Sequence, residues 1–204
     1  MSITLILIIL TAVVTYGGFN NPELKAKLMF NPYRTYHYKE WHRLLGHGFI
    51  HADMMHVFFN LFVLYSFGNA VEGAYSHYFG VKSGALFMLL YIGGIVASSL
   101  ITLSKHKDNP GYNALGASGA VSAVVFSAIA IMPTMELGIL FIPIGIPGWI
   151  FGILYLVYSQ YMSKKNIDNI GHDAHIWGAI YGFLITMAFR PAFLAEFLEQ
   201  IINN

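Results

Sequence analysis

Long runs of uncharged, apolar residues constrain the fold of this chain more than any other feature of its sequence. Six such segments occur, at about residues 3–18, 54–71, 81–103, 115–132, 147–162 and 174–189. Because about 20 apolar residues in a helix cross the hydrocarbon core, they predict an all-α, polytopic membrane protein with six transmembrane helices. The first, fifth and sixth are short by this rule, so we expect them to include flanking residues or to lie in a thinned bilayer.

Composition agrees with a membrane protein and excludes several functions. Of 204 residues, 56% are hydrophobic and 10% charged, whereas a soluble domain carries about 25% charge. The chain has no cysteine, which excludes disulfides and thiolate chemistry. A net charge of +1 without a clustered basic face excludes the usual nucleic-acid footprint. The length suits a single domain, 1–204, and the start is expected to be a first membrane helix rather than a removed signal peptide.

The link 19–53 between the first two segments combines aromatic and basic residues. Such side chains suit the headgroup layer of a bilayer, and a link this long is either functional or disordered. We expect a folded element embedded in the membrane interface; an anchoring belt without further role is the alternative. The tail after Pro191 is expected to form a short amphipathic surface helix. The residues behind these expectations are Lys25, Lys27, Tyr33, Arg34, Tyr36, Tyr38, Lys39, Trp41, Arg43, Glu196 and Glu199.

Small residues crowd around one serine in the segment 113–123. Ser118 lies between Gly116 and Gly119. If a helix begins near Leu115, Ser118 lies in its first turn, where backbone N–H groups are unpaired and the helix dipole is positive. A hydroxyl there can become a nucleophile whose oxyanion meets free N–H donors. The alternative is that these small residues only permit close helix packing.

Polar side chains occur at two further places within the apolar segments, where they are costly and indicate function. His56 and Asn60 are four residues apart, so they share a helix face, and both donate hydrogen bonds when neutral. His175 precedes Gly178 and Gly182, whose spacing permits close contact with another helix.

These groups together predict a serine–histidine dyad. If the helices of Ser118 and His175 approach closely, the imidazole can take the serine proton at neutral pH. His56 and Asn60 would then donate hydrogen bonds to the oxyanion. Asp173 is two residues from His175 and would face elsewhere on a helix, so we expect a dyad rather than a triad.

The sequence resembles the rhomboid intramembrane serine proteases over nearly its whole length. Their motifs appear in the family's order, as Trp41-His42-Arg43, the set His51, His56 and Asn60, the pair Gly68 and Glu72, Gly116-x-Ser118-Gly119, and Ala174-His175-x-x-Gly178. The resemblance implies a rhomboid-like bundle that cleaves transmembrane helices of protein substrates through an acyl-enzyme, without metal or cofactor. It implies Ser118 as nucleophile, His175 as general base, and His56, Asn60 and the Ser118 backbone as oxyanion hole. Gly116, Gly119, Gly178, His51 and Arg43 would support the site.

Two positions depart from the family pattern. Ser122 stands where a tyrosine often stacks on the catalytic histidine, so we expect His175 to be held less firmly, or by another aromatic such as Trp177 or Tyr181. The family's Trp-Arg pair appears as His42-Arg43. The segment 147–162, rich in bulky aromatics, is the expected movable gate; these are Trp149, Phe151, Tyr155 and Tyr158.

Three other functions agree less well with the sequence. A zinc site would use the pairs His47/His51 and His172/His175, but intramembrane carboxylate ligands are missing and the Ser-Gly context would be unexplained; His47 is rather expected as an interfacial loop residue. A catalytically inactive rhomboid-like protein that binds membrane helices is disfavoured because both the serine and the histidine are present. A transporter or channel is disfavoured because the segment cores contain no charged residue.

The expected location is the bacterial cytoplasmic membrane, with membrane lipid and transmembrane helices as partners. Basic residues concentrate in the odd-numbered links, so the positive-inside rule places those links in the cytoplasm. The bacterial members of the family place them outside, and we adopt the family's orientation because the first link is expected to fold at the interface. No feature of the sequence specifies an oligomeric state.

Overall fold

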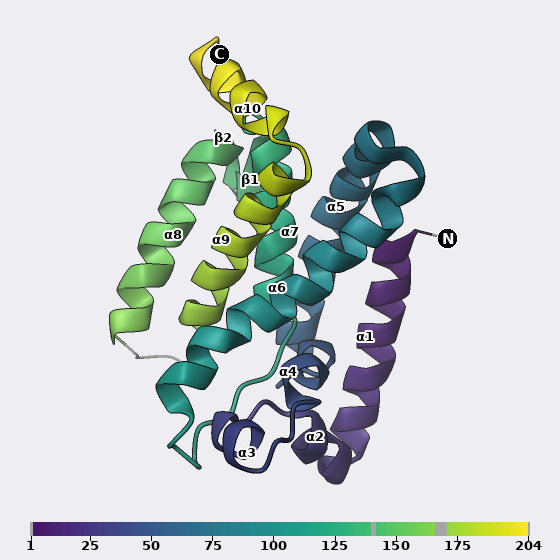
Figure 1. Cartoon of the computed structure of the whole chain (residues 1–204), viewed down its shortest axis with the longest axis vertical. Helices are drawn as coiled ribbons and strands as arrows, with labels where there is room; N and C mark the ends of the chain where they lie inside the picture. Colours follow the sequence, from purple (N-terminus) through teal and green to yellow (C-terminus); the bar gives the residue numbers. More distant parts are fainter. Residues whose placement is uncertain (1, 140–141, 166–170, 204) are drawn as a thin grey trace.

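The fold is described from a computed structural model, which describes residues 2–139, 142–165 and 171–203 (Figure 1). Within these residues the chain is all-α except for one antiparallel hairpin. The longer helices are α1 (Ile3–Asn20), α5 (Met54–Phe79), α6 (Ser83–His106), α7 (Ser118–Ile131), α8 (Gly148–Lys165) and α9 (His172–Phe189). The shorter elements are α2 (Pro22–Leu28), α3 (Pro32–His37), α4 (Arg43–Gly46), α10 (Ala192–Ile202), the 3₁₀ turns η1 (His47–Phe49) and η2 (Gly80–Lys82), and strands β1 (Glu136–Ile139) and β2 (Ile142–Pro147).

Each of the six apolar segments corresponds to one of the longer helices, but the ends of these helices differ from the predicted ends. The helices α5 and α6 continue to Phe79 and His106, beyond the expected ends at 71 and 103. The expected helix start near Leu115 is wrong, because Gly116 has a φ of 120° and α7 begins only at Ser118. A positive φ is incompatible with a right-handed helix.

By length and hydropathy alone, fewer than six helices of the described chain meet the criteria for a membrane span. Two stretches of the described chain qualify, Ile3–Asn20 and Met54–His106, the second containing both α5 and α6. The helices α9 and α10 qualify only as a pair, across a bend of 112°. The apolar helix α7 has 14 residues, fewer than the roughly 20 that cross a bilayer. The number of six spans therefore stays a prediction.

The helix α7 is the centre of the bundle (Figure 1). Every residue of α7 after Ser118 is buried, as expected of a helix that is apolar on all sides. The fully buried hydroxyl of Ser127 lies 3.0 Å from the Tyr75 hydroxyl of α5 and 2.8 Å from the Thr186 hydroxyl of α9. The three helices are thus joined by apolar packing and by a satisfied cluster of hydroxyl groups.

The expected close contact between α7 and α9 is confirmed. A Cβ atom added to Gly178 would lie 2.1 Å from the carbonyl oxygen of Gly119, and one added to Gly182 would lie 2.1 Å from that of Ala123. The two backbones therefore touch at two successive turns, which only glycine at 178 and 182 allows. This contact brings the N-terminal ends of α7 and α9 together.

The helix α1 is attached to α5 by a glycine and a carboxylate. A Cβ atom at Gly68 would lie 2.7 Å from the Thr4 hydroxyl. One turn further along α5, the Glu72 carboxylate accepts hydrogen bonds from the backbone N–H groups of Ile3 and Thr4, at 2.8 and 2.7 Å. It satisfies donors at the start of α1 that lack intrahelical partners, and its charge suits the positive end of the helix dipole.

The link 19–53 is folded, as predicted, into α2, α3, α4 and η1 at one end of the bundle (Figure 1). The Arg43 side chain is 5% exposed, and its Nη1 donates to the carbonyl oxygens of Ala26 and Met29 at 2.6 and 2.7 Å. The predicted supporting role of Arg43 therefore has a defined basis, since its guanidinium ties the end of α2 to α4.

We expect Gly182→Ala to destabilise the protein by about 1–3 kcal/mol, because the new methyl overlaps a backbone carbonyl that cannot rotate away. Thermal unfolding of the detergent-solubilised protein measures the effect. Gly73→Ala on α5 is the matched control, since no atom lies within 4 Å of its added Cβ. Equal unfolding temperatures for the two variants would contradict the α7–α9 contact.

Candidate active site

The loop before α7 is fixed by glycine geometry. Gly116 adopts a φ of 120°, and a Cβ atom on it would lie 2.6 Å from Cε1 of His56. Its backbone N–H donates to the carbonyl oxygen of His47 at 2.9 Å. The chain can therefore turn directly into α7 beneath the His56 ring, which places Ser118 as the first helical residue.

The start of α7 presents backbone N–H groups beside Ser118. The first N–H groups of any helix have no intrahelical partner. One neighbouring donor, the N–H of Ala117, is taken by Nε2 of His51 at 3.2 Å. The N–H groups of Ser118 and Gly119 lie in the first turn, beside the half-buried Ser118 hydroxyl. Such donors can stabilise an oxyanion that forms next to that hydroxyl.

The fully buried His51 joins three parts of the chain. Because Nε2 accepts from Ala117, the proton of the neutral ring is on Nδ1, which lies 3.0 Å from the Thr15 hydroxyl of α1. The ring packs edge-to-face against His56, with centroids 4.9 Å apart. Burial, with the nearby His56 as a smaller cause, lowers the pKa of His51 to about 3. The neutral His51 ring thus connects α1 to the loop before Ser118 by hydrogen bonds.

His56 and Asn60 lie at the beginning of α5. The Asp53 carboxylate caps this helix by accepting from the N–H of His56 at 2.8 Å. Asn60 is buried, and its Nδ2 donates to the carbonyl oxygen of His56 at 2.9 Å. The structure therefore places the His56 ring against Gly116, and Asn60 one turn deeper on the same face.

The first turns of α7 and α9 meet next to the two predicted catalytic residues. The carbonyl oxygen of Ala174 lies 3.5 Å from the position of a Cβ on Gly119. Ser118 and His175 are the chain neighbours of these two contacting residues. The His175 ring lies edge-to-face with His172 at a centroid distance of 5.7 Å. The arrangement thus brings the hydroxyl-bearing and imidazole-bearing helix ends together.

A tyrosine from α8, not named from the sequence for this role, stacks on His175. The Tyr155 ring lies 6.1 Å from that of His175 at an interplanar angle of 23°, and its hydroxyl lies 2.7 Å from the Ser122 hydroxyl. Of the aromatics named from the sequence, Tyr181 donates its hydroxyl to the carbonyl of Leu89 at 3.0 Å, and Trp177 is 39% exposed.

The signal that could have identified Tyr155 was Ser122 itself. It lies on the same helix face as Ser118, and a small side chain at that position leaves space for a ring from a neighbouring helix. The sequence by itself predicts Tyr155 only as one of the bulky aromatic residues of the movable gate.

The carboxylate of Asp173 binds partners on α6 and α8. Its two carboxylate oxygens bind Lys105 of α6 at 2.6 Å and Ser163 of α8 at 2.5 Å. Within the described parts of the chain, no three His, Asp or Glu residues are grouped so that they could hold a metal ion.

Hydrogen bonds connect the backbone of Arg43 to the loop before Ser118 through His47. The predicted position of His47 in the link is correct, but its ring is buried rather than interfacial. Its Nδ1 donates to the carbonyl of Arg43 at 2.9 Å, and its Nε2 lies 3.1 Å from the hydroxyl of Ser99. Because the carbonyl of His47 accepts from Gly116, the link is connected by hydrogen bonds to the loop before Ser118.

A second connection runs from the link to the same loop. Phe30 and Ala114 exchange two backbone hydrogen bonds, each of 2.9 Å. Asn31 donates from its side-chain amide to the carbonyls of Pro110 and Tyr112 at 3.0 and 3.2 Å. The link is therefore bonded to the segment that leads into α7. It is more than an anchoring belt.

The fold and the site define a helical integral membrane protein. A serine and several histidines gather in it where helix ends meet. Residues 38–192 match the family model described as the Rhomboid domain. The chain therefore belongs to the rhomboid family, as the motifs predicted.

Two curated relatives agree with this assignment. The chain is 29% identical over 147 residues to RHOMBOID-like protein 12, mitochondrial, of Arabidopsis thaliana, a match covering 68% of this chain and 43% of the relative. It is 29% identical over 172 residues to Rhomboid protease GluP of Bacillus subtilis (strain 168), covering 80% of this chain and 29% of the relative. The chain thus spans less than half the length of these relatives.

We expect stability to fall as the pH falls from about 6.5 to about 4, partly because of His47. Burial lowers its pKa from 6.5 to about 4, so in this window the unfolded chain binds a proton that the folded protein excludes. The contribution is at most about 3–4 kcal/mol, at about 1.4 kcal/mol per pKa unit. His47→Gln should flatten the pH dependence of the unfolding temperature, whereas exposed His42→Gln on the same link should not. Parallel profiles for all three proteins would contradict this account.

Proposed function

We propose that this chain is a rhomboid serine protease, an intramembrane endopeptidase that cleaves transmembrane segments of membrane-protein substrates. The observation that carries the proposal is the contact between the first turns of α7 and α9, beside Ser118 and His175. Family membership and the resemblance to a relative named as a protease support it.

In the proposed mechanism, His175 takes the proton of the Ser118 hydroxyl, and the serine oxygen attacks a substrate carbonyl. The His56 ring, the Asn60 amide and the first-turn N–H groups of α7 stabilise the oxyanion. His175 then protonates the leaving amine, and water hydrolyses the acyl-enzyme. The steps require only groups of this chain and water. A substrate helix must unwind, because its carbonyls are otherwise bound in its own hydrogen bonds.

The proposed gate for substrate is α8. Among its described residues only Gly148, Gly152 and Ser159 are buried, and large apolar side chains such as Val157 are exposed. The helix lies at the periphery of the bundle (Figure 1). Its inner side chains, among them Phe151 and Tyr155, pack against α7, so opening would separate this one contact surface. We place the protein with six spans in a bacterial cytoplasmic membrane, with the site opening on the side of the link 19–53.

Labelling with a fluorophosphonate probe tests the proposal. The wild-type protein should be labelled and should cleave a transmembrane reporter, whereas Ser118→Ala and His175→Ala should lose both activities, by a factor of about 10³ or more. Ser66→Ala, at an exposed position on α5, is the matched control. A folded wild-type protein that is not labelled and does not cleave would favour a catalytically inactive protein that binds membrane helices.

The stacking of Tyr155 on His175 gives a second prediction. Tyr155→Leu should lower kcat by about tenfold, because the imidazole loses the ring that fixes its orientation. Tyr155→Phe keeps the ring and loses only the bond to Ser122, so its kcat should fall less than about threefold. Tyr161→Leu, exposed on the same helix, should leave the rate unchanged. Equal rates for Tyr155→Leu and Tyr161→Leu would exclude an orienting role.

A further inference from the structure

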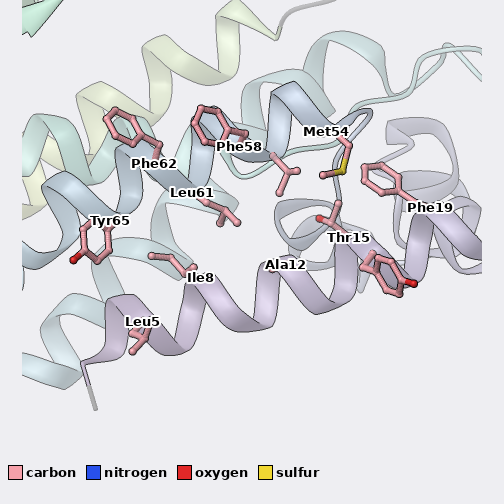
Figure 2. Close-up of a pocket in the computed structure, with 12 residues that line it drawn as sticks. Leu5, Ile8, Ala12, Thr15, Phe19, Met54, Phe58, Leu61, Phe62 and Tyr65 are labelled. Atoms are coloured by element: carbon pink, nitrogen blue, oxygen red, sulfur yellow. The ribbon is translucent and has the colours of Figure 1, made fainter. Parts of the chain in front are cut away.

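An apolar groove lies between α1 and α5, away from the candidate active site. Figure 2 shows Ile8 of α1 and Leu61 of α5 pointing toward one another between the two helices. Leu5 and Ala12 from α1 and Phe58 and Tyr65 from α5 also line the groove. The cavity has a volume of about 610 Å³. Its two walls belong to the two stretches that length and hydropathy qualify as membrane spans. The groove therefore faces the hydrocarbon region.

The groove is wide enough for one hydrocarbon chain and too narrow to enclose a whole helix. From Leu5 to Phe19 it extends about 21 Å along α1, at 1.5 Å per residue. Its volume over this length gives a mean cross-section of about 30 Å². An α-helix with side chains, about 10–12 Å across, needs about 80–110 Å². A single methylene chain, whose atoms contact neighbours at about 4 Å, needs about 20 Å².

A cation marks one end of the groove. The Nζ of Lys25 lies 3.4 Å from the carbonyl oxygen of Ala52, close in the chain to Met54 of the groove lining. The Lys25 Cβ also lies 3.9 Å from the position of a Cβ on Gly18, the residue before Phe19 of the lining. The ammonium group is thus held on α2 where α1 ends and α5 begins, the end at which the link 19–53 meets the bundle.

The acidic side chain next to this end is already engaged. The carboxylate of Asp53 caps α5 by accepting from the N–H of His56. Among the described residues the Lys25 ammonium forms no ion pair and bonds only to a carbonyl oxygen, so it can bind an external anion. Lysine side chains at a bilayer surface attract anionic lipid headgroups, and their apolar stems extend along the hydrocarbon boundary.

We propose that the groove between α1 and α5 is a binding site for one anionic phospholipid. One acyl chain lies between the two helices, and the phosphate of the headgroup contacts Lys25. Thr15 connects the bound chain to the protein interior, because it lines the groove and its hydroxyl lies 3.0 Å from Nδ1 of His51.

Photo-crosslinking tests the proposal in the full chain, reconstituted in phosphatidylglycerol vesicles. A trace of phosphatidylglycerol with a diazirine in its acyl chain is photolysed, and the labelled peptides are identified by mass spectrometry. Label should concentrate in peptides of 3–20 and 54–65, relative to the exposed face of α8. Equal labelling of α8 and the groove would mean ordinary boundary lipid and would overturn the proposal.

Two matched pairs of variants test the two halves of the site. Ala12→Phe places a ring in the groove and should reduce groove labelling by about threefold or more, because the ring occupies the volume of the chain. Val13→Phe, beside it on α1 and 63% exposed, should not. Lys25→Gln should reduce labelling by about twofold or more, whereas Lys27→Gln, with the same charge change on α2, should not.

The α8 labelling of each variant and its unfolding temperature report folding independently of the groove. Undiminished labelling of Ala12→Phe, or equal losses for the two lysine variants, would overturn the phospholipid site. Displacement of the groove label by an equimolar transmembrane peptide would also overturn it, in favour of helix docking.

Discussion

The contact between the backbones of α7 and α9 is the interaction on which the rest of the structure depends. Gly178 and Gly182 bring α9 against the carbonyl oxygens of Gly119 and Ala123. In a membrane protein, helices gain little from the hydrophobic effect between them, so close van der Waals contact at small residues stabilises their association. The same contact sets the distance between the helix ends that carry the serine and the histidine. Packing and the candidate chemistry therefore share one geometric requirement.

A second requirement is the pairing of backbone N–H groups around the start of α7. The bonds from Gly116 to the His47 carbonyl and from Ala117 to His51 satisfy two donors, and the first-turn donors beside Ser118 come next in the chain. The acceptors come from the link 19–53, which is itself held by the buried Arg43. The link is therefore part of the site's framework, and its rigidity limits how far the loop before α7 can move.

The motifs indicate which candidate residues share a helix face, but not which residues of other helices contact them. The spacing of His56, Asn60, Gly178 and Gly182 indicated shared helix faces, because these are relations within one helix. The stacking of Tyr155 on His175 and the burial of the His47 ring depend on contacts between segments far apart in the sequence. Local periodicity carries no information on such contacts, so Trp177 and Tyr181 were equally reasonable candidates until α8 was placed.

The sequence by itself determined that this chain is a helical membrane protein of the rhomboid family, because apolar length and the order of motifs are properties of the linear chain. It also determined the glycine positions at which helices can touch. Only the tertiary structure decided where α7 begins, since a φ of 120° at Gly116 follows from packing beneath His56. It likewise decided which aromatic ring covers His175, and that α1 and α5 leave a groove of about 610 Å³ between them. Those outcomes depend on how side chains of separate helices fill a shared volume, which no single segment specifies.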